Sequence, residues 1–453
     1  MNLSIFDILY HKYKITKPIR LIEFFAGYGS QALALKYLGV KFEHWKICEW
    51  AIKSIQAYKD IHFNNINFDF SGDLTKDNLV KVLYELGISS NYNEPMTRKQ
   101  IERLSEQQLK NIWNNIVTTK NLVNIQQVKG KDLKIVDTDK YDYILTYSFP
   151  CQDLSLAGKG KGMSDTSTRS GMLWEVERIL TECHELGILP QILLMENVPQ
   201  VHGSDNVADF NKWQLRLEEL GYKNYFQDLI ATDYGIPQTR NRCFMISILG
   251  DYSYTFPKPI PLKLKLKDML EDNVDGKYYL SDKMINYISS RMPTGDNKIT
   301  TGINMGNKKE MNNAGTITTG EGSKPSSNYI IDNDDYDYSK EKGKIIKIKN
   351  ATKKGYLEAT DGDGIDLAQP NSKTRRGRVQ KNTVQTLTTQ NNLGVVNDLR
   401  IRKLTPKECF RLMGVKDEDY EKVRKNQSDS SLYHLAGDSI VVNVLMAIFK
   451  ELL

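Results

Sequence analysis

Cysteine is scarce in this sequence of 453 residues, and the five cysteines that occur are far apart. They are Cys48, Cys151, Cys183, Cys243 and Cys409. An odd number at such spacings excludes a disulfide framework, and the lack of any CxxC pair removes the usual zinc motif. We therefore predict a protein of a reducing cytoplasm, with no metal site.

Long apolar runs are also missing. No stretch approaches the ~20 apolar residues that span a bilayer, and the N-terminal residues lack the pattern of a signal peptide. The composition, 40% hydrophobic and 26% charged, is that of a globular protein with a sizeable core, and the length favours two domains. We expect a soluble, intracellular protein with no membrane partner. Its net charge of +6 permits contact with phosphate but does not establish it.

What the first half does contain is an alternation of strand-like and helical patterns. Residues 76–135 interrupt it; they are polar, with helical spacing in places, and are interpreted as an insertion. The alternation predicts a mostly parallel sheet with helices on both faces, whose ligands bind at the carboxyl ends of the strands. The predicted strands lie within residues 19–25, 41–49, 65–74, 141–151, 190–201 and 242–249, and the predicted helices within 30–39, 172–187 and 213–221.

The character of the chain changes near residue 256. From there to about residue 400, Gly, Asn, Thr, Lys and Asp dominate, which favours a second domain of short strands and loops. It includes an acidic run at 332–337 and a basic run at 373–381. A helix is predicted again at 402–414, with Thr405 as its cap and Pro406 in its first turn. A turn and an apolar helix end the chain.

Three predicted strand ends carry residues suited to a nucleoside. Gly27 and Gly29 in FAGYGS allow close approach of a ligand, and the missing third glycine argues against a dinucleotide. Glu49 could accept hydrogen bonds from ribose hydroxyls, and Trp50 could stack on adenine, although a core aromatic is the more common role. Asp73 could bind the adenine amino group, or it could cap the following helix.

Two further strand ends carry reactive groups. Cys151 follows Pro150 at the end of a predicted strand and precedes a Gly-rich, basic loop that could close over an anionic substrate and favour the thiolate. Glu196 follows an apolar strand, where desolvation would raise its pKa, as a proton-holding group requires. Arg240 and Arg242 alternate with Gln238 at a strand start and could bind a phosphate or a carbonyl oxygen, or simply form a polar strand face.

Taken together, these pieces resemble the DNA (cytosine-5)-methyltransferase family. The matching motifs occur in the family's order, from residue 21 to the C-terminus: FAGYGS, CEW, GDL, SFPCQDLS, MENV, QTRNR, RKLTPKECFRLMG and GDSIVVNV. The resemblance is greatest to bacterial and phage enzymes of the restriction-modification or solitary type. It implies an α/β fold: a Rossmann-like mixed sheet of the S-adenosylmethionine-dependent methyltransferases, flanked by helices, with a smaller irregular target-recognition domain.

The resemblance also implies a role for each matching residue. Cys151 would attack C6 of a flipped-out cytosine, Glu196 would hold N3, and Asn197 would position the base and the catalytic loop. Arg242 would contact O2, and Arg240 would lie near the cysteine and a phosphate. The S-adenosylmethionine pocket would be formed by Phe25, Gly27, Gly29, Glu49, Trp50, Asp73, Leu74 and Ser439. One position departs from the family, because its usual Gly-Asn-Ser is Gly437-Asp438-Ser439 here.

The same resemblance gives a domain plan and partners. Residues 1–255 would form the catalytic domain, 256–430 the target-recognition domain, and 431–453 a segment returning to the first. The expected partner is double-stranded DNA, with a cognate restriction endonuclease acting separately, and a monomer is the default. The expected DNA contacts are Lys159, Lys161, Arg169, Arg375, Arg376 and Arg378.

Three rival functions stay open from the sequence. The first is a tRNA cytosine-5 methyltransferase, which uses the same motifs; the large region after residue 256 favours DNA. The second is an inactive sequence-specific DNA-binding protein, against which the joint presence of Cys151, Glu196 and Arg242 argues. A zinc-dependent cytosine deaminase also flips bases, but none of the six histidines has the required ligand spacing.

Overall fold

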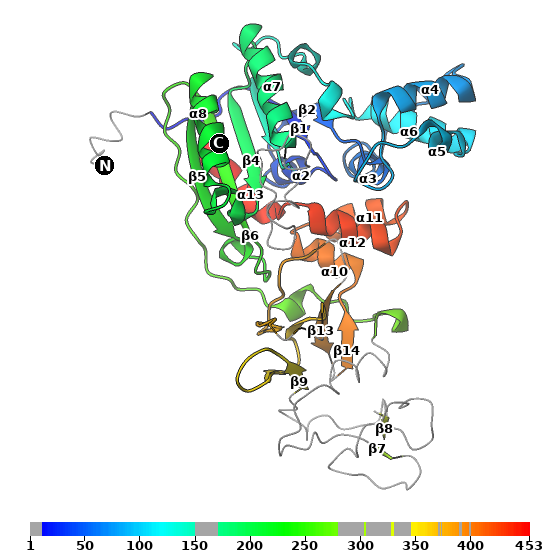
Figure 1. The fold of residues 1–453 in the computed structure, drawn as a ribbon, viewed down its shortest axis with the longest axis vertical. Coiled ribbons are helices and arrows are strands. Elements are labelled where there is room, and N and C mark those ends of the chain that lie inside the picture. Colours follow the sequence, from blue (N-terminus) through cyan, green and yellow to red (C-terminus); the bar gives the residue numbers. More distant parts are fainter. Residues whose placement is uncertain are drawn as a thin grey trace. The chain divides into compact units, whose positions relative to one another are not determined.

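The computed structural model describes residues 11–149, 171–279, 303–304, 328–329, 346–369, 372, 374–388, 392–397 and 400–453. The chain divides into two compact units (Figure 1). The first unit comprises residues 1–236, 240–262 and 410–453, and the second comprises 237–239 and 263–409. The return to the first unit therefore begins at Phe410, earlier than the boundary at residue 430 expected from the sequence, because the helices after it pack on the first unit.

A six-stranded sheet organises the first unit, with strand order β2-β1-β3-β4-β6-β5. Its strands are β1 (Ile19–Phe24), β2 (Phe42–Cys48), β3 (Asp142–Tyr147), β4 (Ile192–Asn197), β5 (Tyr222–Ile230) and β6 (Asn241–Leu249). The first four strands run parallel, whereas β6 is antiparallel to both β4 and β5. The sheet is thus mixed, and the polar strand β5 was not predicted from its sequence.

Helices cover both faces of this sheet. On one face, α7 (Met172–Glu185) and α8 (Val207–Glu219) cover side chains of β3, β4 and β6 and form one core cluster with them (Figure 1). Trp213 of α8 is fully buried there, and its indole N–H donates to the Tyr147 hydroxyl at 3.1 Å. On the other face, α13 (Val442–Leu452) packs beside α2 (Ser30–Tyr37), and its residues approach Phe244 of β6. The central strands β1, β3, β4 and β6 are therefore largely buried on both faces, whereas the edge strands β2 and β5 are partly exposed.

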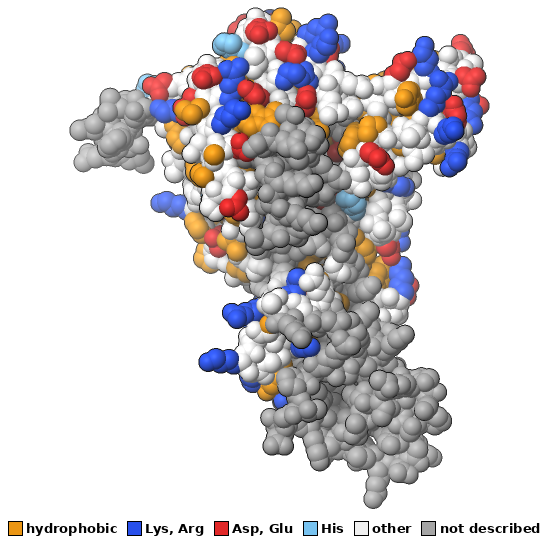
Figure 2. Space-filling model, viewed as in Figure 1, with side chains coloured by type: hydrophobic (Ala, Val, Ile, Leu, Met, Phe, Trp, Pro, Cys, Tyr) orange, Lys and Arg blue, Asp and Glu red, His pale blue; other side chains and the backbone are white. Residues whose placement is uncertain are grey.

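Residues 76–135 form a helical layer beside β2. They contain α4 (Lys76–Leu86), α5 (Arg98–Glu102), α6 (Glu106–Thr118), η1 (Ile125–Gln127) and η2 (Gly130–Leu133). The three α-helices form a core of their own with α3 (Ile52–His62), whereas Ile125 and Leu133 of the two 3-10 turns belong to the core under α7. The first three of these helices begin with reciprocal capping boxes at Thr75, Thr97 and Ser105. Their outer surface carries charges of both signs (Figure 2), including the pair Arg98–Glu102.

The prediction of a strand at residues 65–74 was wrong. This segment has no regular secondary structure, and Phe68 is 67% exposed despite the alternating pattern. The outer edge of β2 is met instead by Asn121, which forms a bridge with Ile47, and the Leu122 N–H donates to the Ile47 carbonyl. A strand-like sequence without a free sheet edge stays irregular.

The chain ends in helices α10 (Pro406–Leu412), α11 (Asp417–Arg424), α12 (Asp429–Asp438) and α13. Thr405 caps α10, as predicted: its hydroxyl accepts from the Glu408 N–H, and the Glu408 carboxylate accepts from the Thr405 N–H. The span Asp429–Leu452 is long and apolar enough for a membrane helix, yet 67% of its most apolar window is buried in the protein. It is also divided at Ser439, so it is a core element of the first unit.

The second unit is built from short strands. A hairpin joins β9 (Ile346–Lys349) to β10 (Tyr356–Ala359), and a separate sheet has the order β12-β11-β13-β14. That sheet contains β11 (Gly364–Asp366), β12 (Val379–Gln380), β13 (Leu393–Asn397) and β14 (Arg400–Lys403), and a separate pair joins β7 (Ile303–Asn304) to β8 (Asn328–Tyr329). Two 3-10 turns, η5 (Leu266–Met269) and η6 (Gly276–Tyr278), precede them. The small core of this unit contains Ile348, Ala359, Ile365 and Val396.

Candidate active site and cofactor pocket

The predicted site residues of the first unit gather at one edge of its sheet. The carboxyl ends of β1, β2, β3 and β4 meet there, and β6 begins there because it is antiparallel to β4. The edge therefore joins Phe25, Glu49 and Phe149, which follow three strands, with Glu196 and Asn197, which end β4. Such an edge is where α/β sheets bind their ligands.

The turn after β1 has the backbone of a ligand-binding cradle. Phe25 has φ +56°, an unusual value for a residue with a side chain, and its N–H donates to the Cys48 carbonyl at 2.8 Å. Gly27 has φ +55°, and a Cβ there would meet only the Ser439 Oγ, 4.0 Å away. Gly29 differs: with φ +81°, its Cβ would lie 2.4 Å from His62 Nε2 and 2.6 Å from the Tyr58 ring. Gly27 thus leaves space for a ligand, whereas Gly29 is required by packing.

Glu49 is fixed against this turn. Its carboxylate accepts from the Gly27 N–H at 3.0 Å and from the Ala51 N–H at 2.8 Å. Burial raises its pKa to about 7, although the two backbone hydrogen bonds oppose that shift. Each carboxylate oxygen retains capacity for a second hydrogen bond, as contact with ribose hydroxyls requires. These residues fit the nucleoside part of S-adenosylmethionine.

Asn121 is a positioning residue that the sequence did not reveal. Its side-chain oxygen accepts from the Glu49 N–H at 3.0 Å, and its amide donates to the Glu49 carbonyl at 2.8 Å. It belongs to residues 76–135, which looked like a mere insertion. No local pattern marks Asn121, because its partner lies 72 residues earlier in the chain.

The other predicted cofactor residues differ in their burial and in their contacts. Trp50 and Leu74 pack, partly buried, against the core of the helical layer, which agrees with the structural alternative weighed for Trp50. Asp73 is exposed, and the cap of α4 is Thr75, so Asp73 is not the cap residue. The Ser439 hydroxyl donates to the Leu435 carbonyl at 2.7 Å while facing Gly27.

The proton-holding carboxylate and one arginine are paired. Glu196 is 6% exposed, and its Oε1 lies 3.1 Å from Arg242 Nε. Burial raises the pKa of Glu196, while Arg242 and Arg240 counteract the shift and Asp438 adds to it. Arg242 also lines a small cleft with Phe244 and, from the C-terminal segment, Val441. Because burial outweighs the two arginines, this carboxylate holds a proton more readily than a solvated glutamate does.

The side chains of Asn197 and Arg240 each donate hydrogen bonds to backbone carbonyl groups. The Asn197 amide donates to the Phe149 carbonyl at 3.0 Å and so fixes the end of the segment that continues to Cys151. Arg240 is 4% exposed and donates to the Gly437 and Ser439 carbonyls at 3.0 and 2.6 Å. Cys151 itself lies outside the described residues, as do Lys159, Lys161 and Arg169.

The departure at Asp438 has a local partner. Its carboxylate lies 2.9 Å from His434 Nδ1, one turn earlier in α12. The carbonyls on either side of Asp438 are those that Arg240 binds. The contacts that shape this turn are therefore made by backbone, which an aspartate supplies as well as an asparagine.

In the second unit, one predicted DNA contact needs correction. Arg378 is 2% exposed and donates to the Asp366 carbonyl at 3.1 and 2.8 Å and to the Lys349 carbonyl at 3.1 Å. It is a structural residue with its side chain enclosed. Arg375 pairs with Asp366 at 2.5 Å and is partly buried, and Arg376 is exposed.

Comparison with known proteins defines the class of this site. Residues 85–453 match the family model described as C-5 cytosine-specific DNA methylase, and the chain belongs to this family. It is 32% identical, over 96% of this chain and 99% of the relative, to the type II methyltransferase M2.ScrFI of Lactococcus lactis subsp. cremoris. It is 36% identical, over 59% of this chain and 68% of the relative, to the orphan methyltransferase M.SssI of Spiroplasma monobiae.

Solved structures share the fold. The Entamoeba histolytica methyltransferase EhMeth has a TM-score of 0.52 at 13% identity, with 96% of this chain and 98% of that chain covered. The S. pombe Dnmt2 methyltransferase has a TM-score of 0.50 at 16% identity, with the same coverage. The predicted fold class is therefore confirmed. The protein is an S-adenosylmethionine-dependent DNA cytosine-5 methyltransferase, as the sequence indicated.

Proposed function

We propose that Cys151 is the nucleophile of this enzyme and that Glu196, Asn197 and Arg242 complete its cytosine site. The observation that carries the proposal is the Glu196–Arg242 pair, 3.1 Å apart and largely desolvated, beside the end of the strand that leads to Cys151. The hydrogen bond from Asn197 to Phe149 holds the backbone two residues before the thiol. These contacts support a site in which the base-binding groups and the nucleophile share one sheet edge.

The residues supply what the reaction requires. The Cys151 thiolate adds to C6 of cytosine, and the electron pair displaced from the ring collects at C5 while Glu196 holds a proton at N3. S-adenosylmethionine, held at the turn after β1 and by Glu49, would supply an electrophilic methyl group to C5, and its sulfur would keep the electrons of the broken bond as S-adenosylhomocysteine. A base then removes the C5 proton, and the electrons of that bond restore the ring double bond as the thiolate leaves. Because the target atom is inaccessible in a stacked duplex, the cytosine must be flipped out.

We assign the cofactor pocket to the turn after β1 and its neighbours. Glu49 would bind the ribose, Trp50 the adenine face, and Asp73 with Leu74 the adenine edge. The backbone at Phe25, Gly27 and Gly29 would shape the methionine end, closed by Ser439. Asn121 would hold Glu49 in position through its two backbone hydrogen bonds.

DNA recognition is assigned to the region around the second unit and to the loop after Cys151. Lys159, Lys161 and Arg169 would contact phosphate from that loop, and Arg375 and Arg376 would contact phosphate or guanine. The domain plan is part of this proposal: catalytic residues 1–255, target recognition from residue 256, and a returning segment that begins at Phe410 rather than at residue 431. Similarity to type II and orphan methyltransferases supports a restriction-modification or solitary role in the bacterial cytoplasm, as a monomer with any endonuclease acting separately.

The test uses a duplex in which 5-fluorocytosine replaces the target cytosine, after bisulfite sequencing of DNA from expressing cells has identified the site. Once S-adenosylmethionine has methylated C5, fluorine cannot leave as a proton does. Wild type supplied with S-adenosylmethionine should therefore become covalently attached, and peptide mapping should place the bond on Cys151. Cys151→Ser should not attach, whereas Cys183→Ser, a buried thiol elsewhere, should. Attachment through another residue would refute the nucleophile assignment. Methyl transfer to tRNA but not to duplex DNA would favour the RNA-modifying alternative. The absence of transfer to either nucleic acid would favour the inactive DNA-binding protein.

A further inference from the structure

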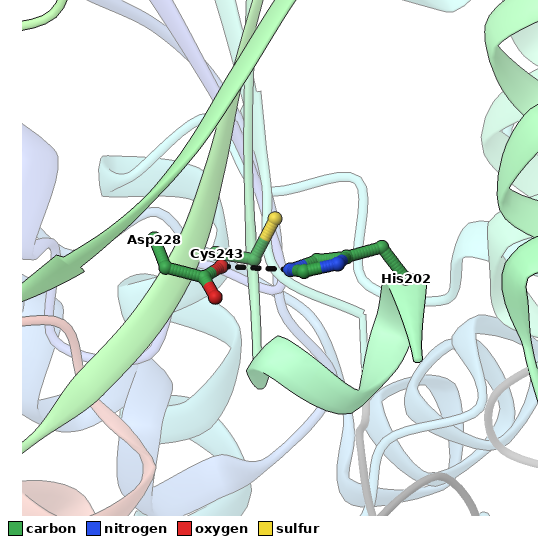
Figure 3. Close-up of side chains that lie close together, drawn as sticks. All are labelled: His202, Asp228 and Cys243. Atoms are coloured by element: carbon green, nitrogen blue, oxygen red, sulfur yellow. Dashed lines mark hydrogen bonds and ion pairs between the residues drawn. The ribbon is translucent and has the colours of Figure 1, made fainter. Parts of the chain in front are cut away.

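A second group of reactive side chains lies on the same sheet. His202 ends η3 (Pro199–His202), Asp228 belongs to β5, and Cys243 belongs to β6 (Figure 3). His202 Nε2 and Asp228 Oδ1 are 2.9 Å apart, and the three ligand atoms all lie within 4.8 Å of one another. Asp228 and Cys243 are direct cross-strand partners, which places both side chains on one face.

This face is opposite to the one that carries Arg242. Side chains alternate along β6, so Arg242 and Phe244 border the cleft beside α13, whereas Cys243 belongs to the core under α7 and α8. Neither the cytosine site nor the cofactor turn uses His202, Asp228 or Cys243. The group therefore needs an account of its own.

We propose that His202, Asp228 and Cys243 bind one divalent transition-metal ion of the zinc type, with solvent in the fourth position. An imidazole nitrogen, a carboxylate oxygen and a thiolate are the three ligand kinds that Zn²⁺ accepts together. A carboxylate and a thiolate neutralise the charge of a dication. Harder ions such as Mg²⁺ prefer oxygen ligands and are disfavoured by the sulfur.

The geometry needs only local adjustment. Zinc–ligand distances of about 2.0–2.3 Å in a tetrahedron place ligand atoms roughly 3.3–3.7 Å apart. The present separations are all within 4.8 Å, and the carboxylate and imidazole atoms, 2.9 Å apart, are closer than in such a tetrahedron. His202 and Asp228 retain 30% and 33% of their side-chain surface, so both can turn and an ion can enter from solvent. Cys243 is buried and supplies a fixed anchor.

Binding has a defined proton balance. The Cys243 thiol loses its proton to solvent as the sulfur–metal bond forms. The imidazole must present the Nε2 lone pair, so its remaining hydrogen resides on Nδ1, and the hydrogen bond to Asp228 is replaced by two metal bonds. Nothing is oxidised or reduced. Metal uptake should therefore release protons and become weaker as the pH falls.

The proposed metal site lies on the same strands as the catalytic edge of the sheet. Asn197, Cys243 and Asp228 form one row across β4, β6 and β5. An ion held here would fasten η3, which directly follows the Glu196-Asn197 segment, to the two antiparallel strands. We expect bound metal to stabilise this half of the sheet against thermal unfolding. The ligands are far apart in sequence, which is why no local motif revealed them.

The experiment is a titration of the metal-stripped full-length chain with Co²⁺, in a Cys151→Ser background that removes the catalytic thiol. We expect one equivalent to give a thiolate-to-cobalt charge-transfer band and tetrahedral d–d absorption, with displacement by Zn²⁺. Cys243→Ser should lose the charge-transfer band, and His202→Ala should bind at least tenfold more weakly. Cys183→Ser, which removes another buried thiol of the same core, should titrate normally.

Two results would overturn the proposal. One is the absence of a charge-transfer band in the Cys151→Ser parent, and the other is an identical titration curve for the parent and His202→Ala. His202 is partly exposed, so its variant keeps the test valid even if Cys243→Ser fails to fold. Because methyl transfer is not measured, failure here leaves the proposed catalytic roles untouched, and failure of those roles leaves this site untouched.

Discussion

Alanine substitutions at Gly27, Gly29 and Gly39, which all have positive φ, distinguish a glycine required for packing from one required for cofactor binding. Gly39 has φ +72° with no atom within 4 Å of the position that a Cβ would occupy, so Gly39→Ala measures the backbone cost alone. A left-handed conformation costs a residue with a side chain about 1–2 kcal/mol. Gly27→Ala should incur the same cost, because only the Ser439 Oγ lies near, at 4.0 Å. Gly29→Ala adds contacts of 2.4 Å with the partly buried His62 and 2.6 Å with the buried Tyr58, for which overpacking costs about 1–3 kcal/mol more.

Thermal unfolding and calorimetric binding of S-adenosylhomocysteine give different orders for the three variants. In unfolding, Gly29→Ala should be the least stable, while Gly27→Ala should match Gly39→Ala. In binding, Gly39→Ala should equal wild type, and Gly27→Ala should lose at least tenfold, about 1.4 kcal/mol, because its methyl group occupies the ligand space. The reasoning is refuted if Gly29→Ala is as stable as Gly39→Ala, or if Gly27→Ala binds the ligand as tightly as wild type.

Further predictions concern the catalytic edge and buried carboxylates. Glu196→Gln should lower single-turnover methyl transfer by about 10²–10⁴-fold with S-adenosylhomocysteine affinity unchanged; an equal loss of that affinity would contradict a role at the base. Asn121→Ala should weaken S-adenosylhomocysteine binding roughly tenfold through loss of two hydrogen bonds to Glu49, measured by calorimetry; unchanged affinity would dismiss its positioning role. Burial raises the pKa of Glu23 to about 7, so its contribution to stability should be lost as pH rises from about 4.5 through 7. Glu23→Gln should flatten that decline in pH-dependent thermal unfolding, and a parallel decline in both proteins would disprove it.

The sequence alone determined the class of enzyme and most strands of the catalytic unit. The apolar run at residues 192–195 and the mostly apolar run at 19–24 favoured strands buried on both faces, and the order of the motifs identified the family. The Thr405 cap and the amphipathic helix at 172–185 were also readable, because each depends on neighbours within one or two turns. Features of this kind can be predicted from sequence because the residues that produce them are close together in the chain.

Tertiary structure decided everything that depends on distant partners. Residues 65–74 have a strand pattern but no sheet edge to join, because Asn121 meets the edge of β2. Asn121 holds Glu49 from 72 residues away. Arg378 resembles a DNA contact in sequence, yet it is enclosed by carbonyl groups of its own unit. Sequence specifies which groups a chain possesses, but burial and hydrogen-bond geometry, which arise only when distant segments pack, specify which of those groups stay available for chemistry.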